Sequence, residues 1–511
     1  ERLLMPSRTI FPPICIALGL PDVDRLIAQA RGEYLAGERF LEFRLDYLPD
    51  PERGIQAMKK FLTRHTDCTI LATCRRRQNQ GRFVGSIEEQ LRVLNSARDN
   101  GAHAVDLEIE SAENCEDRLA ELRASTYLLL SYHNYGGTPP RLDHVLKRMT
   151  RIPAHGYKIV TTAKKPSDTS RVLTLAKQHS KIPMILLAMG EPGFATRVLS
   201  PALGGLYTYA APNMAGGTAP GQVSAKKLRS IYRVGKFSRD AKIYGVIADP
   251  VSHSISPNVH NRAFQAKRID ASYLPFLVKP GQLKDFFTMA EDLPLAGFSV
   301  TIPHKQKIIR YLDQVDLVAK RIGAVNTVWR KGGQWRGTNT DAPGVTVPLE
   351  RHVRLNKSSV LVVGNGGAAR GAVFALAEAG AKLSLTGRNI DRVRALASAC
   401  GAEPLSRDQA ESRMFDVVVH ATPLGMAPNL DQCFFRDKIP GKLVFDMVYT
   451  PLETELLKRA RAQKAVVVPG LEMFIEQASR QFEIWTEQRA PRAIMEQAAM
   501  EALEARATGK L

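Results

Sequence analysis

Short apolar stretches alternate with polar ones along residues 14–211. The polar stretches favour helices, and examples are Pro21–Gly37, Ser86–Asn100 and Ser167–Ser180. The apolar stretches are rich in β-branched or aromatic residues, as buried strands are, and they are Ile14–Gly19, Phe40–Tyr47, Thr69–Cys74, Ala104–Ile109, Tyr127–Asn134, Tyr157–Ala163, Met184–Gly190 and Leu206–Ala211. Eight strand-then-helix units of this kind predict an α/β fold that begins with a (β/α)8 barrel.

Two dipeptides mark expected helix starts within this region. Asp50-Pro51 and Thr138-Pro139 each place an N-cap residue type before a proline. Proline suits the first helical position because its missing N–H would have no partner there. We therefore expect helices to begin at Pro51 and Pro139.

The pattern changes after the barrel region. Ser224–Asp240 is helical and then polar and basic, and a new strand-helix alternation starts at Ile243. Glu472–Arg489 predicts a long helix that Pro491 interrupts, followed by a helical tail to Leu511. We expect a barrel domain at 1–232, a small α/β substrate domain at 233–345, a Rossmann-like dinucleotide domain at 346–470 and C-terminal helices at 471–511 that return to the substrate domain.

Composition narrows the range of partners. The 511 residues carry 71 Lys and Arg against 51 Asp and Glu, a net charge of +20. Because this charge is spread along the chain, it favours anionic metabolites and a phosphorylated cofactor over nucleic acid. No apolar run approaches the roughly 20 residues that a membrane helix needs, so we expect no membrane span.

Six cysteines, at positions 15, 68, 74, 115, 400 and 433, form no CxxC pair and show no metal-ligand spacing. Most lie in apolar stretches, where free thiols are usually buried. We therefore expect no metal and a reducing, cytoplasmic compartment. The sequence begins with Glu1 rather than Met, which leaves a removed organellar leader open.

Two residues near barrel strand ends suggest chemistry. Lys158 follows Gly156-Tyr157, and His133 lies in the segment Ser131–Tyr135. Each has a simpler interpretation: a lysine that extends to solvent, and a hydrogen-bonded core histidine. On adjacent strands of one barrel, they instead predict an imine-forming lysine beside a general base. Cationic neighbours and apolar flanks would make the amine of Lys158 nucleophilic.

The first half resembles the type I 3-dehydroquinate dehydratases. The matching segments keep that family's order and spacing over about residues 1–232, and they are 42–46, 73–75, 131–134, 157–160 and 219–222. The resemblance implies that Lys158 forms a Schiff base with the substrate ketone and that His133 moves the proton. It also implies substrate contacts for Glu42, Arg44, Arg75, Arg197 and Gln222, with Met189 as an apolar wall. The family usually has Glu where this chain has Asn79, and Ser where it has Thr218.

The second half carries polar residues at a series of turns. They occur in Ser254–Ser256, Thr301–Lys305, Gly323–Thr327 and Gly337–Asp341. Taken singly, each has a plain interpretation, such as a helix N-cap at a serine or a surface ion pair between Lys305 and Asp341.

A glycine-rich turn, Gly364–Ala368, follows the apolar segment Val360–Val363 and precedes the helix-like Gly371–Ala379. This strand–turn–helix context predicts a dinucleotide phosphate site. The next strand, Lys382–Thr386, is followed by Arg388 and Arg392 rather than by an acidic residue. The arginines favour NADP over NAD, because guanidinium groups bind a 2′-phosphate well. The alternative is that each arginine is a solvated surface charge.

These blocks resemble shikimate dehydrogenase over about residues 240–490. Further matches are Ala421–Met426, Asp446–Tyr449 and Gly470–Gln477, in the family's order. The resemblance implies that Lys305 and Asp341 are the catalytic pair. Its further implied contacts are Ser254, Ser256, Thr301, Asn326 and Gln477 for shikimate, and Gly364, Gly366, Gly367, Ala368, Arg388, Arg392, Tyr449 and Gly470 for the cofactor. Where the family often has Asn, this chain has Gly387 and His420, and either change would loosen the preference for NADP.

Together the two halves predict a bifunctional enzyme that dehydrates 3-dehydroquinate and then reduces 3-dehydroshikimate to shikimate. An alternative is a dehydratase fused to an NAD-dependent quinate/shikimate dehydrogenase. A binding protein without catalysis and a nucleic-acid binder are further alternatives, which the intact catalytic residues and the even charge disfavour. Since neither site needs a second subunit, we expect a monomer.

Overall fold

The structure is a computed structural model of the chain, and it describes residues 11–213, 218 and 221–507. By their contacts, the residues fall into two compact units. The first extends to Ile243 and includes Leu274–Pro294, and the second comprises Tyr244–Tyr273 and the chain from Leu295 onward.

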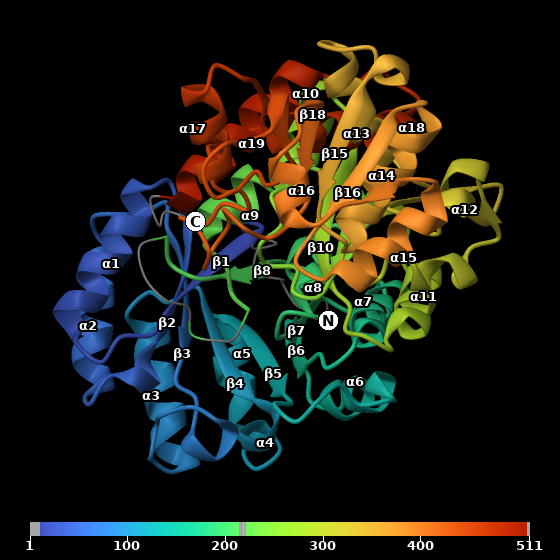
Figure 1. The fold of residues 1–511 in the computed structure, drawn as a ribbon. Coiled ribbons are helices and arrows are strands. Elements are labelled where there is room, and N and C mark those ends of the chain that lie inside the picture. The colour runs from blue at the N-terminus through green and yellow to red at the C-terminus, as the bar shows by residue number, and fades with distance from the viewer. Residues whose placement is uncertain (1–10, 214–217, 219–220, 508–511) are drawn as a thin grey trace. The chain divides into compact units, whose positions relative to one another are not determined.

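Eight parallel strands of the first unit curl into a barrel (Figure 1). They are β1 (Ile14–Leu18), β2 (Phe40–Arg44), β3 (Thr69–Thr73), β4 (Ala104–Glu108), β5 (Tyr127–His133), β6 (Gly156–Thr162), β7 (Met184–Met189) and β8 (Thr208–Ala210). Their order is β7-β6-β5-β4-β3-β2-β1-β8. At the seam between β7 and β8, the N–H of Leu206 donates to the carbonyl of Met184 at 2.8 Å. The predicted (β/α)8 barrel is confirmed.

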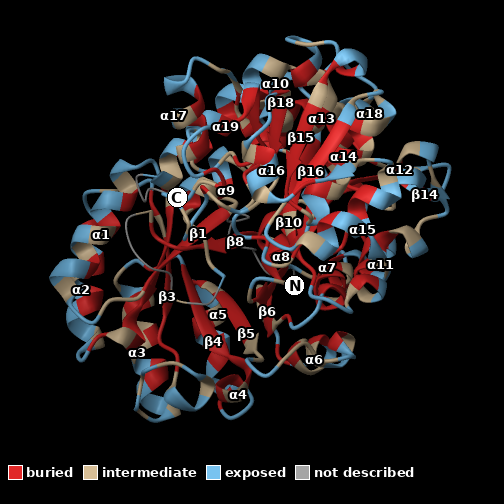
Figure 2. Ribbon diagram, in the orientation of Figure 1, coloured by how far each residue is buried: buried red, intermediate tan, exposed pale blue. Residues whose placement is uncertain are grey.

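The strands of this unit are apolar because they are buried beneath its helices. In Figure 2 the strands are buried, whereas the helices expose polar faces. The helices are α1 (Val23–Leu35), α2 (Pro51–Leu62), α3 (Ile87–Asp99), α4 (Ile109–Ala112), α5 (Leu119–Ser125), α6 (Leu142–Met149), α7 (Pro166–Gln178), α8 (Phe194–Leu199), α9 (Ala225–Ser230) and α11 (Leu283–Asp292). At one end of the barrel, the ring of Phe11 stacks on Phe40 with centroids 5.1 Å apart and closes the core.

One expected helix start is confirmed and the other is wrong. Asp50 caps α2 by accepting from the N–H groups of Glu52 and Arg53. In contrast, α6 begins at Leu142, beyond Pro139. The hydroxyl of Thr138 donates to the carbonyl of Thr162 at 3.1 Å, so this side chain is bound to the end of β6 instead of capping a helix.

Hydrogen bonds between α11 and α7 explain why residues 274–294 belong to the same unit as the barrel. The carboxylate of Asp285 on α11 accepts from the backbone N–H of Ser167 at 2.8 Å and from its hydroxyl at 2.7 Å. Asp292 accepts from the hydroxyl of Ser170 at 2.8 Å. Because Ser167 and Ser170 lie in the first turns of α7, α11 is fixed to the helix that follows β6.

A second sheet is mixed and has the order β10-β9-β11-β13-β14-β12. Strand β13 runs antiparallel to both of its neighbours. The strands are β9 (Lys242–Ala248), β10 (Ala271–Leu277), β11 (Leu295–Val300), β12 (Gln314–Val315), β13 (Thr327–Lys331) and β14 (Gln334–Thr338), with helices α10 (Ser256–Ala266) and α12 (Leu317–Ile322).

The third sheet has the strand order of a Rossmann fold. Its parallel strands run β17-β16-β15-β18-β19-β20, which is the order 3-2-1-4-5-6. They are β15 (Ser359–Val363), β16 (Lys382–Thr386), β17 (Glu403–Pro404), β18 (Phe415–His420), β19 (Gly441–Asp446) and β20 (Val466–Val468). In such sheets a ligand binds where the strand order reverses, at the carboxyl ends of strands 1 and 4. Here these are β15 and β18.

Seven helices accompany this sheet or follow it: α13 (Asp341–Glu350), α14 (Gly367–Glu378), α15 (Ile390–Cys400), α16 (Arg407–Glu411), α17 (Glu455–Ala462), α18 (Gly470–Thr486) and α19 (Arg492–Ala507). As predicted, the helix is interrupted near Pro491: α18 ends at Thr486 and α19 begins at Arg492. Within the described ranges, no helix is long and apolar enough to cross a membrane.

Candidate active sites

Lys158 lies inside the barrel, and its ammonium group has three polar neighbours. Nζ donates to Oδ2 of Asp106 at 2.8 Å and to the hydroxyl of Tyr209 at 3.0 Å, and it lies 3.9 Å from Oε1 of Glu42. All four side chains are buried. They come from β6, β4, β8 and β2, so the closure of the barrel gathers them. The nearest charged partners of Lys158 are thus carboxylates, and the expected cations lie beyond them, with Arg75 4.0 Å from Asp106.

Asp106 is the most tightly held of these groups. Besides the bond from Lys158, it accepts from the hydroxyl of Ser131 at 2.5 Å, and Nη2 of Arg75 lies 4.0 Å away. Burial alone would raise the pKa of Asp106, but Lys158 and Arg75 outweigh it and hold that pKa below the usual value. Asp106 thus remains a carboxylate beside the lysine.

His133 shares the inner face of the barrel with Lys158. Ser131 is the register partner of Lys158 across β5 and β6, and residues two apart on a strand point the same way. Burial lowers the pKa of His133 well below its usual value, and the positive charges of Arg75, Lys158 and Arg44 lower it further. The imidazole is therefore neutral at neutral pH, as a general base must be.

Arg44, Arg75 and Arg197 bring positive charge into the same barrel end. The guanidinium of Arg44 forms two bonds of 2.8 Å to Asp46, and Nη1 of Arg75 donates to the hydroxyl of Tyr135 at 3.4 Å. Arg197 donates to the backbone carbonyl of Tyr209 at 3.3 Å, and burial lowers its pKa to about 10. These cations suit an anionic substrate.

The rest of the predicted dehydratase site is placed less directly. Oε1 of Gln222 accepts from the backbone N–H of Thr218 at 2.8 Å. Ala219 and Pro220, from the matching segment 219–222, lie outside the described residues. Met189 is buried at the end of β7. Asn79 donates to Glu110 at 3.2 Å, so its amide faces a carboxylate from the segment after β4.

The sequence interpretation missed the roles of Asp106 and Tyr209. Asp106 was visible as an acidic residue in an apolar segment, which is the signal that could have singled it out. Tyr209 gave no such signal, because a tyrosine in a strand is typical of a core. Its position against Lys158 depends on β8 pairing with β1.

The second candidate site is built around Lys305 and Asp341. Nζ of Lys305 lies 2.7 Å from Oδ2 of Asp341, and Nδ2 of Asn326 donates to Oδ1 of the same carboxylate at 2.9 Å. The side chains of Lys305 and Asp341 are 32% and 17% exposed, so the pair is more enclosed than the surface ion pair of the plain interpretation. Asn326 and Asp341 are further joined through Thr340.

The other predicted shikimate residues lie on neighbouring turns and on α18. The N–H of Thr301, after β11, donates to the carbonyl of Ile247 on β9, so the Thr301 turn adjoins the turn that holds Ser254 and Ser256. The hydroxyl of Ser254 accepts from the N–H of Ser256 at 3.2 Å. Gln477 lies on α18, and a Cβ at Gly344 on α13 would lie 3.5 Å from its Cβ. Asp341 begins that same helix α13.

The glycine-rich turn fits a dinucleotide. Gly364 has a φ of +131°, and a Cβ there would lie 2.6 Å from the carbonyl oxygen of Ala421, so no larger residue fits. Beyond it, Gly366 and Gly367 open α14, and a Cβ on either would meet nothing within 4 Å. Ala368 is exposed in the first turn of the helix. Free space before a helix N-terminus is what a diphosphate requires.

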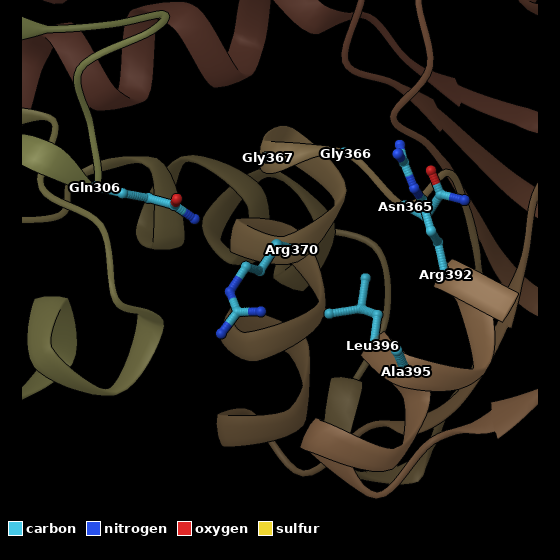
Figure 3. Close-up of a pocket in the computed structure, with 8 residues that line it drawn as sticks. All are labelled: Gln306, Asn365, Gly366, Gly367, Arg370, Arg392, Ala395 and Leu396. Atoms are coloured by element: carbon cyan, nitrogen blue, oxygen red, sulfur yellow. The ribbon is translucent and has the colours of Figure 1, made fainter. Parts of the chain in front are cut away.

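A pocket of about 340 Å³ adjoins this turn (Figure 3). Arg370 and Arg392 supply its positive charge, and its full lining is Gln306, Asn365, Gly366, Gly367, Arg370, Arg392, Ala395 and Leu396. Arg388 is exposed on the neighbouring loop and does not line the pocket. Of the two arginines predicted from the sequence, the pocket thus contains one, together with Arg370, which the sequence interpretation did not single out.

The last two predicted cofactor residues lie after β19. Tyr449 packs its ring 5.2 Å from that of Phe474 on α18, and burial raises its pKa. A Cβ at Gly470 would lie 2.6 to 2.8 Å from three carbonyl oxygens of residues 446–448. Only glycine therefore allows α18 to begin this close to the carboxyl end of β19.

Models of known families match most of the chain. Their descriptions are Type I 3-dehydroquinase at residues 14–237, Shikimate dehydrogenase substrate binding domain at 246–328, Shikimate / quinate 5-dehydrogenase at 349–427 and Shikimate 5'-dehydrogenase C-terminal domain at 470–500. A chloroplastic bifunctional 3-dehydroquinate dehydratase/shikimate dehydrogenase from Arabidopsis thaliana is 33% identical over 505 residues, which cover 94% of this chain and 83% of the relative. The chain belongs to this bifunctional family.

Relatives of the second half alone are also found. A shikimate dehydrogenase (NADP(+)) from Bacillus cereus strain 03BB102 is 38% identical over 256 residues, covering 48% of this chain and 92% of that enzyme. A crystal structure of a shikimate dehydrogenase in complex with NADP+ is 34% identical with a TM-score of 0.50, and the match covers 52% of this chain and 97% of that one. The predicted family and the two-enzyme organisation are confirmed.

Proposed function

We propose that this member of the bifunctional family converts 3-dehydroquinate to 3-dehydroshikimate at Lys158 and then reduces it to shikimate with NADPH at Lys305. The observation that carries the first step is the buried Lys158 beside Asp106, with neutral His133 on the adjacent strand. The second step is supported by the Lys305–Asp341–Asn326 cluster and by the open glycine-rich turn. The names of the relatives support the choice of NADP.

In the dehydratase half, Nζ of Lys158 attacks the substrate ketone as the free amine, the proton that it gave up passes to the ketone oxygen, and loss of that oxygen as water gives an iminium ion. His133 removes the C2 proton, the freed electron pair forms a C2–C3 double bond, and the π pair of the C–N double bond moves onto nitrogen to give an enamine. The enamine expels the C1 hydroxyl, which takes the proton from His133 and leaves as water. Hydrolysis of the imine then consumes one water and frees 3-dehydroshikimate and Lys158. The net change is the loss of one water.

In the dehydrogenase half, this chain's residues handle the proton. Reduced nicotinamide, held by the glycine-rich turn, would supply the hydride for the carbonyl carbon. Lys305 donates a proton to the carbonyl oxygen, and Asp341, held by Asn326, fixes the position of the ammonium group. Ser254, Ser256, Thr301 and Gln477 bind the carboxylate and hydroxyls of the ring.

We propose the boundaries 1–232, 233–345, 346–470 and 471–511 for the four functional segments. We also propose that the chain acts as a monomer in the cytoplasm. Its six cysteines are free, and each candidate site is assembled from residues of one chain. Sedimentation velocity on the purified protein should give a single species of the 56.4 kDa monomer, and a dimer would contradict the proposal.

The whole proposal is tested by supplying 3-dehydroquinate and NADPH to the purified chain and following NADPH absorbance. Wild type should oxidise NADPH, and the Lys158→Ala variant should not until 3-dehydroshikimate is added. Oxidation with NADH but not with NADPH would instead indicate the NAD-dependent alternative. If NADPH is oxidised with 3-dehydroshikimate but not with 3-dehydroquinate as the substrate, the dehydratase half is inactive.

The dehydratase half should remain active in mildly acidic solution. Only neutral His133 accepts a proton, so activity is lost as pH falls through the pKa of His133. Burial and three cations place that pKa well below 6.5, so kcat/KM should stay flat from about pH 8 to below about pH 6. The measurement is 3-dehydroshikimate absorbance across a pH series. An acid limb centred near pH 6.5 would contradict this assignment.

Arg392 should contribute to the preference for NADPH. Replacing it by alanine removes a guanidinium from the pocket beside the glycine-rich turn. The KM for NADPH should rise about 10- to 100-fold, the effect of one charged hydrogen bond, with little change for NADH. Arg394→Ala, on the same helix α15 and exposed, is the matched control. Equal losses for NADPH and NADH would show that Arg392 does not recognise the 2′-phosphate.

A further inference from the structure

A buried hydrogen-bond chain crosses the carboxyl ends of β18 and β19. Nε2 of His420 lies 2.6 Å from the hydroxyl of Thr422, and Nδ1 of His420 lies 2.9 Å from Oδ1 of Asp446. The other oxygen of Asp446 accepts from the hydroxyl of Thr454 at 2.5 Å. His420 and Asp446 are 1% and 0% exposed, so bulk solvent does not reach their side chains.

The bonds around Asp446 restrict where protons can lie. The N–H of Val448 also donates to Oδ1 of Asp446, and the hydroxyl of Thr454 accepts from the N–H of Leu457, which leaves its own proton for Asp446. A carboxylate only accepts, so the network assigns a proton to Nδ1 of His420. With the imidazole neutral, Nε2 is an acceptor and the hydroxyl proton of Thr422 points to it; a protonated imidazole would reverse this bond.

Because its proton is used toward His420, the hydroxyl oxygen of Thr422 can act only as a hydrogen-bond acceptor toward other groups. It already accepts from the N–H of Leu424 at 3.2 Å, which uses one of its two lone pairs. The second lone pair is left for another donor. Thr422 is half-buried rather than enclosed, so a ligand has access to it.

Thr422 stands at the dinucleotide turn. Its strand β18 pairs in register with β15, with His420 opposite Val363, and a Cβ at Gly364 would lie 3.3 Å from Cγ2 of Thr422. These are the two strands at which the sheet order reverses. The segment after β19, which holds Tyr449, lies on the other side of β18.

We propose that Thr422 binds the carboxamide N–H of the nicotinamide ring and that His420 and Asp446 are positioning residues which hold its hydroxyl as an acceptor. The inference rests on the proposed use of NADP. The donors on this half of the dinucleotide are the carboxamide N–H and the ribose hydroxyls, whereas the phosphates are acceptors that this lone pair would repel. Of these donors, the carboxamide belongs to the ring that has to be oriented for hydride transfer. The family often has Asn at position 420, and its short side chain offers no two opposed nitrogens to span from Asp446 to Thr422.

Calorimetric titration with NADP+ and with its 3-acetylpyridine analogue, in which a methyl group replaces the carboxamide amino group, tests this contact. Thr422→Val, which keeps the shape and loses the hydroxyl, should bind NADP+ about three- to tenfold more weakly. The same change should leave the Kd of the analogue within about twofold. Thr422→Ser, which keeps the hydroxyl, should bind NADP+ far better than Thr422→Val does. His420→Asn should weaken the binding of NADP+ but not that of the analogue.

Equal weakening of both ligands in Thr422→Val, or no weakening of either, would overturn the proposed contact. If His420→Asn binds NADP+ as wild type does, the positioning role of His420 is wrong. A wild-type chain that binds neither NADP+ nor the analogue would instead overturn the use of NADP itself. The exposed Arg394→Ala variant on α15 is the control, and it should bind both ligands as wild type does.

Discussion

Replacing Lys158 with alanine should abolish the dehydratase activity and leave the dehydrogenase activity intact. No other described lysine lies among buried carboxylates on the inner face of the barrel, and without an amine there is no iminium ion to accept electrons from C2. Loss of a covalent nucleophile should lower kcat by about 10⁴-fold or more. The measurement is 3-dehydroshikimate formation from 3-dehydroquinate.

Two controls separate chemistry from folding. Lys147→Ala, on the exposed face of α6, should retain full dehydratase activity. Sodium borohydride should trap substrate on wild type, seen as a mass increase at Lys158, and should trap none on Lys158→Ala. If the variant kept more than about one hundredth of the activity, general acid–base catalysis alone would account for the rate and the imine would be excluded.

The strand positions of the barrel were predictable because each strand is buried on both faces. A run such as Met184–Met189 has no polar residue to confuse the pattern, and the structure ends β7 at Met189. The wrong helix start at Pro139 has a long-range cause. Thr138 has the residue type of an N-cap, but its hydroxyl bonds to the end of β6, a strand that local sequence could not place beside it.

The site was predictable at its strand ends but not in its contacts. Lys158 and His133 follow from reading polar residues on neighbouring strands. The bond from Lys158 to Tyr209 joins residues 51 positions apart and depends on barrel closure. Sequence reasoning consequently expected cations next to Lys158, and it could not see that Asp106 contacts both the lysine and Arg75.

In the second half, local motifs placed the glycine-rich turn because a strand, a tight turn and a helix are consecutive in sequence. They could not rank Arg388 against Arg392, since both are exposed and only the path of α15 brings Arg392 to the pocket. In the sequence, His420 stood out only because the resembled family often has Asn at that position. Its bonds to Asp446 and Thr422 arise because β18 and β19 are adjacent in the sheet.

Replacing Lys305 with alanine should strongly reduce the dehydrogenase activity. The ammonium is the proton donor nearest to the Asp341–Asn326 cluster, and the alkoxide formed by hydride addition needs that proton. Removing such a general acid typically costs about 10²- to 10⁴-fold, so we expect kcat for 3-dehydroshikimate reduction to fall by about 10³-fold. Stopped-flow NADPH oxidation measures the step, and the dehydratase activity of the same sample reports on folding.

Asp341→Asn distinguishes proton transfer from simple binding. It keeps the shape and the bond from Asn326 but removes the charge that holds Lys305, so kcat should fall while the Kd for NADPH stays the same. Lys307→Ala, exposed two residues beyond Lys305, is the matched control and should leave kcat unchanged. If Lys305→Ala raised only the KM for 3-dehydroshikimate, the lysine would bind the substrate without moving its proton, and the proton would have to come from solvent.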